Sequence, residues 1–268
     1  MKNALRRIAK ELSLVKSAQP LEFYGGLIFL AGLALIIPLI FLAPHAVSGE
    51  NAWIKPAKFF FSTALYVWTM GWIQLNLPRL KPDTSIWKNQ LSWWIVGGMA
   101  IENMIITLQA TRGVQSHFNQ TSVLDIVLYA IMGVFAVAQI PAAFVILRKF
   151  MKMETKSNLI LGIELGLMAF ILGGFEGVYL SAQRGHTVGA TDGGAGLPLV
   201  NWSLQHGDLR IAHFVLLHGL QILPLLAIML GQHPRSPLIL KVSFAAIVAI
   251  SVGLFIQAFL GYSVASLF

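Results

Sequence analysis

Long apolar runs separated by short polar segments dominate the pattern along this chain. Seven runs have about the 20 residues that a helix needs to cross a bilayer. They are Leu21–Leu42, Ala57–Leu77, Leu91–Thr111, Val123–Leu147, Leu159–Leu180, Ile211–Leu230 and Val242–Ser263. The sequence lacks the alternating ten-residue segments of a membrane barrel. The pattern therefore predicts an all-α polytopic membrane protein, a seven-transmembrane-helix bundle that forms a single domain over residues 21–268.

The segment 1–20 has a different pattern. Leu5, Ile8, Leu12 and Val15 follow helical spacing, and basic residues take other positions around them. This arrangement is typical of an amphipathic interfacial helix on a membrane surface. The alternative is a frayed basic tail that only sets orientation. The first apolar run is too long for a secretory signal, so we expect it to be a true span.

Composition and charge support a membrane location. Hydrophobic residues make up 56% of the 268 positions and charged residues only 11%, against about 25% charged residues in soluble domains. There is no cysteine, which excludes disulfide scaffolds and thiolate metal sites. With the N-terminus inside, fourteen Lys and Arg fall on inner segments and five on outer ones, namely Lys55, Lys58, Arg112, Arg184 and Arg210.

This bias predicts a cytoplasmic N-terminus and an outside C-terminus. We expect a multi-pass protein of the plasma membrane, in a bacterium the inner membrane. The lipid bilayer is then the main partner, and the basic excess needs no nucleic acid. A small or lipid-soluble ligand and a homo-oligomer remain open as further partners.

Ionisable residues inside the spans are costly and indicate function. Glu102, Glu164 and Glu176 lie more than two residues from the span ends, and no interior Lys or Arg offsets them. We expect them to be protonated, hydrogen-bonded or bound to a cation. Glu22 and Asp125 lie near span ends, where we expect their side chains to reach the headgroups.

Two histidines, His213 and His218, share the sixth span. A rise of about 1.5 Å per residue matches Glu102 in depth with His218, and Glu176 with His213. The pattern predicts a metal site made of these four residues, in which Glu102, Glu176 and His218 also serve as catalytic acid–base groups. The two rings lie about 140° apart on a helix, so one His with a Glu from another helix is the easier site. The alternative is a histidine hydrogen-bonded to a neighbouring helix.

Polar groups are concentrated in the outer half. Arg112, His117, Arg184 and Arg210 are candidates to bind an anionic group of a substrate or cofactor, including haem propionates. The long outer loop 181–210 contains the glycine-rich stretch Thr191–Gly196, which permits close approach to an anion or is merely flexible.

The fifth span carries Gly162, Gly166, Gly173 and Gly177. These glycines form one stripe, which predicts close packing against another helix. Glu176 borders the stripe, so we expect it to point into the bundle. Asp208 is a plausible N-cap for the sixth helix.

The stretch Gly193–Leu220 resembles an uncharacterised bacterial family of multi-span membrane proteins, and the resemblance implies no activity. Three hypotheses follow for function. The first is an outward-facing cavity with a metal ion, zinc or iron, or a haem, which serves a membrane oxidoreductase or hydrolase. The second is a proton-coupled transporter that uses the buried glutamates. The third is a membrane receptor for a small molecule. Whether the chain is an enzyme stays open.

Overall fold

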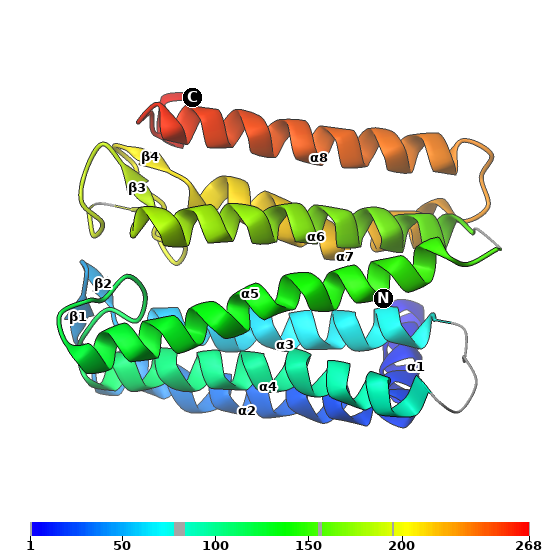
Figure 1. The fold of residues 1–268 in the computed structure, drawn as a ribbon, viewed down its shortest axis with the longest axis horizontal. Helices are drawn as coiled ribbons and strands as arrows, with labels where there is room; N and C mark the ends of the chain where they lie inside the picture. Colours follow the sequence, from blue (N-terminus) through cyan, green and yellow to red (C-terminus); the bar gives the residue numbers. More distant parts are fainter. Residues whose placement is uncertain (1, 78–83, 155–156, 195, 268) are drawn as a thin grey trace. The chain divides into compact units, whose positions relative to one another are not determined.

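The chain folds almost entirely into helices, as Figure 1 shows. The structure is a computed structural model that describes residues 2–77, 84–154, 157–194 and 196–267. The helices are α1 (Lys2–Ala18), α2 (Pro20–Leu42), α3 (Ile54–Leu75), α4 (Thr84–Thr111), α5 (Val123–Met151), α6 (Asn158–Gln183), α7 (Arg210–Leu230) and α8 (Ser236–Phe259), with a 3-10 turn η1 (Val264–Leu267). Four two-residue strands are β1 (Ala46–Val47), β2 (Glu50–Asn51), β3 (Thr187–Val188) and β4 (Gly207–Asp208).

Six of the described helices, α2 and α4 to α8, are long and apolar enough to cross a membrane. The all-helical prediction is confirmed, and these helices indicate a multi-pass membrane protein. The helix α3 covers the predicted second span but is not among the six, because polar residues such as Lys55, Lys58 and Gln74 interrupt its apolar sequence. The seven-span count and the orientation stay predictions. Arg79, Lys81 and Lys156, which contribute to the predicted orientation, lie outside the described residues.

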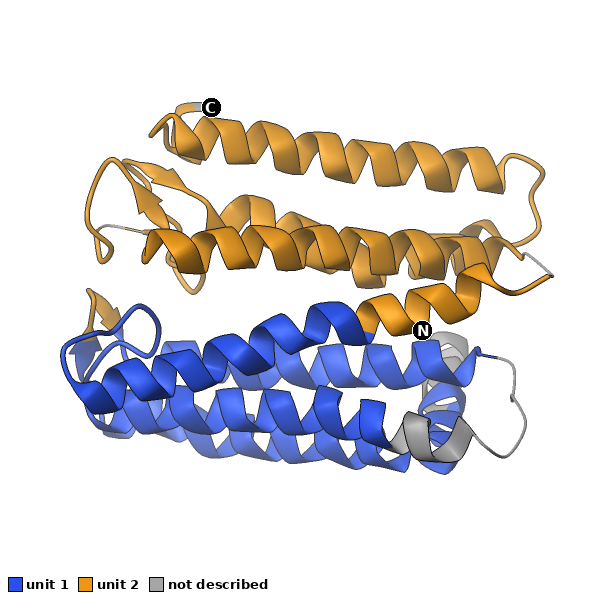
Figure 2. Cartoon of the chain, viewed as in Figure 1, with its two compact units in different colours: residues 1–46, 51–142 blue, residues 47–50, 143–268 orange. Residues whose placement is uncertain are grey.

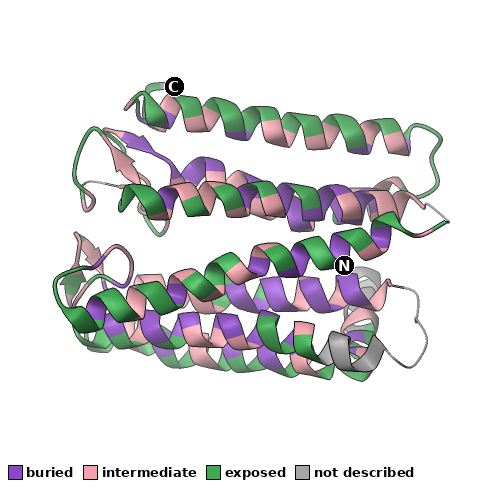
Figure 3. Cartoon of the chain, viewed as in Figure 1, coloured by how far each residue is buried: buried purple, intermediate pink, exposed green. Residues whose placement is uncertain are grey.

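Figure 3 shows many exposed positions on the helices, and many large apolar residues are among them. Leu35 and Phe41 on α2 are 73% and 76% exposed, and Val242 on α8 is 58% exposed. A soluble monomer rarely exposes such a large apolar area. These faces are suited to contact lipid.

The chain divides into two compact units, which Figure 2 distinguishes. Unit 1 comprises residues 1–46 and 51–142, and unit 2 comprises residues 47–50 and 143–268. In unit 1, α2, α3 and α4 pack against one another and α1 lies against α2 and α3. A cluster of Ile105 and Ile106 from α4 with Met132 from α5 forms part of its core. The prediction of one domain over residues 21–268 is not tested by this division.

Glu22 is completely buried in unit 1, which corrects the expectation that it reaches headgroups. Its side chain is 0% exposed, and its Oε1 accepts hydrogen bonds from Gln74 Nε2 at 2.7 Å and Ser92 Oγ at 2.5 Å. The helix α1 contributes to this end of the unit, because Trp72 Nε1 donates to Glu11 Oε2 at 3.0 Å. Residues Lys2–Ala18 of the predicted segment are helical, and the place of this helix on a membrane surface stays a prediction.

In unit 2 the predicted glycine stripe is confirmed as the face of α6 that packs on α7. A Cβ atom added at Gly162 would lie 2.7 Å from Ala227 Cβ, and one at Gly173 would lie 3.0 Å from Leu216 Cβ. Such close approach is available only to residues without a side chain. The stripe therefore lets α6 and α7 form the most extensive helix pair of the fold.

The long loop after α6 is shorter and more ordered than predicted. The helix α6 continues to Gln183, and β3 and β4 pair antiparallel with Thr187 opposite Asp208. Gly207 lies so close to the backbone of Ala258 in α8 that no side chain would fit there. These contacts hold the loop on the ends of α6, α7 and α8.

Candidate functional site

The buried carboxyl group of Glu102 faces a histidine in unit 1. Glu102 lies on α4 and is 6% exposed, and its Oε1 lies 3.9 Å from Nε2 of His117. His117 belongs to the loop between α4 and α5, at the end of the unit that we expect to face outside. The loop thus brings an imidazole to a carboxyl group fifteen positions earlier in the chain.

The other ring nitrogen of His117 contacts two polar groups. Nδ1 lies 3.2 Å from Nζ of Lys55, at the start of α3, and 3.0 Å from Oγ of Ser116. The ring also packs against Phe59 and Tyr129, with centroid distances of 5.8 and 6.3 Å. A carboxyl, an imidazole and an ammonium group are therefore gathered in a partly apolar setting, which strengthens the electrostatic coupling between them.

The helices around Glu102 are linked by further buried polar contacts. Tyr66 Oη on α3 donates to Gln139 Oε1 on α5 at 2.9 Å, and Asn103 Nδ2 on α4 donates to Thr63 Oγ1 on α3 at 3.0 Å. In a bilayer, such hydrogen bonds satisfy groups that lipid cannot. They fix the helices that carry Glu102 and Lys55.

Some positions of α3 and α4 are buried and apolar. Val67, Met70 and Ile73 on α3 and Ile95 on α4 are all 0% exposed. No polar side chain among these four links Glu102 to the buried Glu22. His117, which lies 3.9 Å from the Glu102 carboxyl group, belongs to the α4–α5 loop.

Arg112 is neutralised within unit 1. Its Nη1 lies 2.6 Å from Oδ1 of Asp125, and it also contacts Gln109. Asp125 is 2% exposed and also accepts a hydrogen bond from Ser122 Oγ at 2.6 Å. The expectation that Asp125 reaches the headgroups is therefore wrong, because Arg112 and the neighbouring hydroxyl groups satisfy it inside the protein. Arg112 was one of the candidates to bind an anionic ligand, and its positive charge is already balanced by Asp125.

In unit 2, Glu176 and His213 make their hydrogen bonds to other groups. Ser251 Oγ of α8 donates to Glu176 Oε1 at 3.0 Å. The His213 ring binds the carbonyl oxygen of Gly173 through Nδ1 at 2.7 Å. Glu176 thus faces α8, as the expected inward direction requires, and His213 adopts the alternative in which a histidine bonds to a neighbouring helix.

The remaining predicted residues are spread over unit 2. His218 binds Phe214 O of its own helix through Nδ1 at 2.8 Å, and Glu164 is half-buried on α6. Arg184 ends α6 in an exposed, left-handed conformation with φ of 58°. Arg210 begins α7 and pairs with Asp208, where Nη2 lies 2.6 Å from Oδ2.

Within the described ranges, no three His, Asp or Glu side chains gather closely enough to coordinate a metal ion. His218 and Glu102, matched in depth by the sequence, belong to different units. The metal and haem alternatives have no support in the described part of the chain.

Asp208 is the charged group whose environment outside the spans is best defined. Burial alone would raise its pKa, but the hydrogen bonds and positive charge of Arg210 outweigh burial and lower the pKa below its ordinary value. Asp208 also accepts the backbone N–H of Arg210, the first residue of α7, at 3.1 Å. The N-cap position of α7 is Leu209, without a side-chain hydrogen bond to the helix, so the prediction of Asp208 as the N-cap is wrong. Asp208 lies one position earlier and pairs with Arg210 instead, which the sequence did not indicate.

No protein-family model, no curated protein and no solved structure matches this chain. Functional inference therefore depends on the chemistry of the described residues. Sequence reasoning found Glu102 and His117 separately but missed Lys55 and Ser116 as their partners. The density of polar residues in the loop after α4 was the only available signal.

Proposed function

We propose that this chain is a multi-pass membrane protein that takes up and releases a proton at Glu102, as a proton-coupled permease does. The observation that carries the proposal is the buried carboxyl group of Glu102 facing the His117 ring, 3.9 Å away. Glutamates within membrane helices are typical of proton-linked transport. In this proposal the site opens outward, and α3 also crosses the membrane, which brings the number of spans to seven. The N-terminus is cytoplasmic, and the membrane is a bacterial inner membrane.

The chemistry of the three groups supports proton exchange. His117 is half-buried between the carboxyl group and the α4–α5 loop, so it is placed to pass a proton between Glu102 and the loop. The Lys55 ammonium group beside Nδ1 adds a positive charge to the site. A substrate that binds near Lys55 would change the charge balance of the site and so couple its binding to protonation.

The site also favours the transporter over the metal-dependent oxidoreductase among our hypotheses. Glu102 has an imidazole partner rather than a set of metal ligands. The apolar layer of Val67, Met70 and Ile73 would separate the site from the inner side in an outward-open state. Alternating access requires such a barrier on one side at a time.

Infrared spectroscopy of the purified full-length protein tests the proton site without a known substrate. The protein is perfused with buffers of different pH, and the C=O stretching band of protonated carboxyl groups is recorded. We expect a band that titrates in the wild type and is absent in Glu102→Gln. The matched control is Glu164→Gln, the same substitution at a half-buried glutamate of another span.

Proton flux provides the second measurement. Proteoliposomes with an internal pH dye and a valinomycin-imposed potassium potential report proton entry. We expect entry that Glu102→Gln abolishes, that His117→Ala slows, and that Glu164→Gln leaves unchanged. If the infrared band and the flux are the same in Glu102→Gln as in the wild type, the proposal is wrong.

A second candidate function rests on Ser116. Its Oγ lies 3.0 Å from His117 Nδ1, while Nε2 of the same ring faces Glu102. A hydroxyl, an imidazole and a carboxyl group in this order are typical of enzymes that hydrolyse acyl groups. Here Ser116 Oγ would attack an acyl carbonyl while His117 accepts its proton and passes it to the leaving alcohol, and water would then hydrolyse the acyl-serine ester. Hydrolysis of short-chain nitrophenyl esters that Ser116→Ala abolishes, with Glu164→Gln active, would favour this function. Equal rates in both variants would exclude it.

A further inference from the structure

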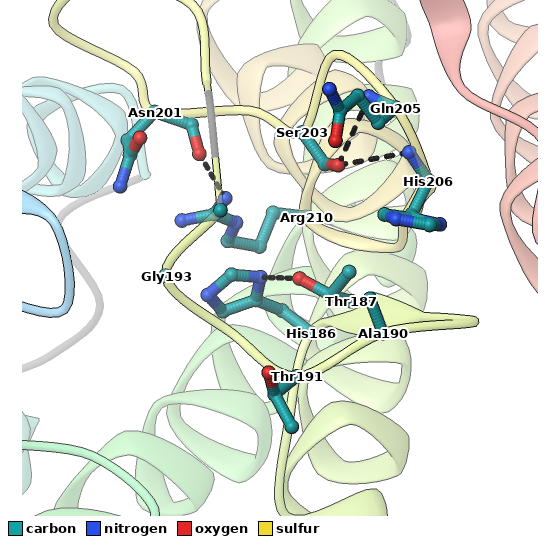
Figure 4. Close-up of a pocket in the computed structure, with 11 residues that line it drawn as sticks. His186, Thr187, Ala190, Thr191, Gly193, Asn201, Ser203, Gln205, His206 and Arg210 are labelled. Atoms are coloured by element: carbon teal, nitrogen blue, oxygen red, sulfur yellow. Dashed lines mark hydrogen bonds between the residues drawn. The ribbon is translucent and has the colours of Figure 1, made fainter.

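A polar cleft lies in unit 2 among the residues that connect α6 to α7, as Figure 4 shows. Its volume is about 170 Å³. The cationic or titratable side chains in its wall are His186, His206 and Arg210, and the others are hydroxyl, amide or glycine positions, with Ala190. No acidic residue is among the described residues that line it. The wall therefore consists mainly of hydrogen-bond donors.

Arg210 presents one free edge of its guanidinium group to this cleft. Nε and Nη2 bind the Asp208 carboxylate at 2.9 and 2.6 Å, and Nη2 also contacts Asn201 O. In the described part of the chain, no hydrogen bond or ion pair involves Nη1, so its two N–H groups remain available. Asp208 thus holds the guanidinium group in place from behind, because the carboxylate is 0% exposed and does not line the cleft.

The two histidines differ in their partners. His186 Nδ1 lies 3.3 Å from Asp192 Oδ1 and 3.2 Å from Thr187 Oγ1. The His206 ring is half-buried, and no hydrogen bond or ion pair of this ring occurs within the described ranges. The His206 ring is therefore free to bind a ligand in the cleft. In Figure 4 the Arg210 guanidinium group lies between Asn201 and His186.

The backbone of the cleft carries strain that a ligand site can explain. Leu199 and Asn201 have φ angles of 68° and 53°, left-handed values that are uncommon for residues other than glycine. Asn201 uses this conformation to direct its carbonyl oxygen to Arg210. Strained residues of this kind cluster at binding sites, where the surrounding contacts hold them.

We propose that this cleft binds a small oxyanion, a carboxylate or phosphate group, through Nη1 of Arg210 and the His206 ring. The planar guanidinium group is held by Asp208 through Nε and Nη2, and the two N–H groups of Nη1 can donate to the oxygens of such an anion. The volume lies below the range of about 300–1,000 Å³ for drug-sized ligands. The cleft therefore suits a small free anion or the phosphate of a lipid headgroup. This site is independent of Glu102, which belongs to unit 1.

Isothermal titration calorimetry on the full-length protein in a detergent with a neutral headgroup tests the free anion. The probes are inorganic phosphate and acetate, with chloride at equal ionic strength as the reference. We expect phosphate or acetate to bind the wild type. Arg210→Lys should weaken binding at least about tenfold, because it keeps the charge but loses the two N–H groups of Nη1. The matched control is Arg184→Lys, at an arginine outside the cleft wall.

The lipid source is tested by adding short-chain phosphatidylglycerol to the same samples. A rise in the thermal unfolding midpoint that Arg210→Lys abolishes would assign the site to a headgroup phosphate. His206→Ala provides a second variant if Arg210→Lys fails to fold, with His233→Ala as its control at a histidine outside the wall. The proposal is overturned if none of the probes binds the wild type. It is also overturned if the cleft variants bind as tightly as their controls.

Discussion

Replacing Asp208 by Asn tests whether one buried ion pair organises the α6–α7 loop. The carboxylate accepts four hydrogen bonds: from Ser203 N at 2.9 Å, Arg210 N at 3.1 Å, Arg210 Nε at 2.9 Å and Arg210 Nη2 at 2.6 Å. The side chain of asparagine ends in one carbonyl oxygen and one NH2 group. The NH2 group would face N–H donors of Ser203 or Arg210 that the carboxylate now accepts. The variant therefore loses bonds and leaves Arg210 without a counter-charge.

The expected loss follows from the burial of the two groups. Breaking a buried ion pair costs about 3–5 kcal/mol. Asp208 is 0% exposed, whereas the Arg210 side chain is 27% exposed and regains some hydration. We therefore expect about 3 kcal/mol, at the lower end of that range. Amide hydrogen exchange of residues 184–209 and chemical denaturation in detergent measure the loss, locally and globally.

The pH dependence gives a second measure of the same pair. The pKa of Asp208 is lowered in the folded protein, so its contribution is complete above the unfolded pKa of about 3.9 and is lost as pH falls through the folded value. The stability difference between wild type and Asp208→Asn should shrink on acidification below about pH 4. Glu154→Gln, at an exposed carboxylate, is the control. A difference within about 0.5 kcal/mol at neutral pH would refute the reasoning.

Two further predictions concern packing and buried polarity. Gly162→Ala places a Cβ atom 2.7 Å from Ala227 Cβ and 2.8 Å from Leu223 O, so we expect a loss of about 1–3 kcal/mol. Gly253→Ala on α8, where the added atom meets nothing within 4 Å, is the control, and equal unfolding midpoints would contradict the packing argument. Glu22→Ala removes the acceptor of two buried donors and should cost about 1–3 kcal/mol, with Glu22→Gln less affected. Denaturation of Glu22→Ala at the wild-type midpoint would show that the cluster is not stabilising.

Features whose interacting residues lie close together along the chain were predictable, and contacts between residues far apart along the chain were not. The glycine stripe of α6 was predictable because four positions on one helix define a face whatever the partner. The N-cap of α7 was predicted one position too early, at Asp208 and not at Leu209, because the exact end of a helix is set by contacts beyond the local sequence. Glu22 was mispredicted because its partners Gln74 and Ser92 are 52 and 70 positions away.

The sequence by itself determined the helical class, the apolar helices and the burial of Glu102, because segment length and hydropathy depend only on the order of residues. Tertiary structure alone decided which groups face this glutamate. Glu102 faces His117, and Lys55 reaches that ring from 62 positions away. Helical depth matched Glu102 with His218 and Glu176 with His213, but depth specifies height along a bundle and not which helices are neighbours. The direction of each helix face and the path of each loop set the partner, and these arise only when the helices pack.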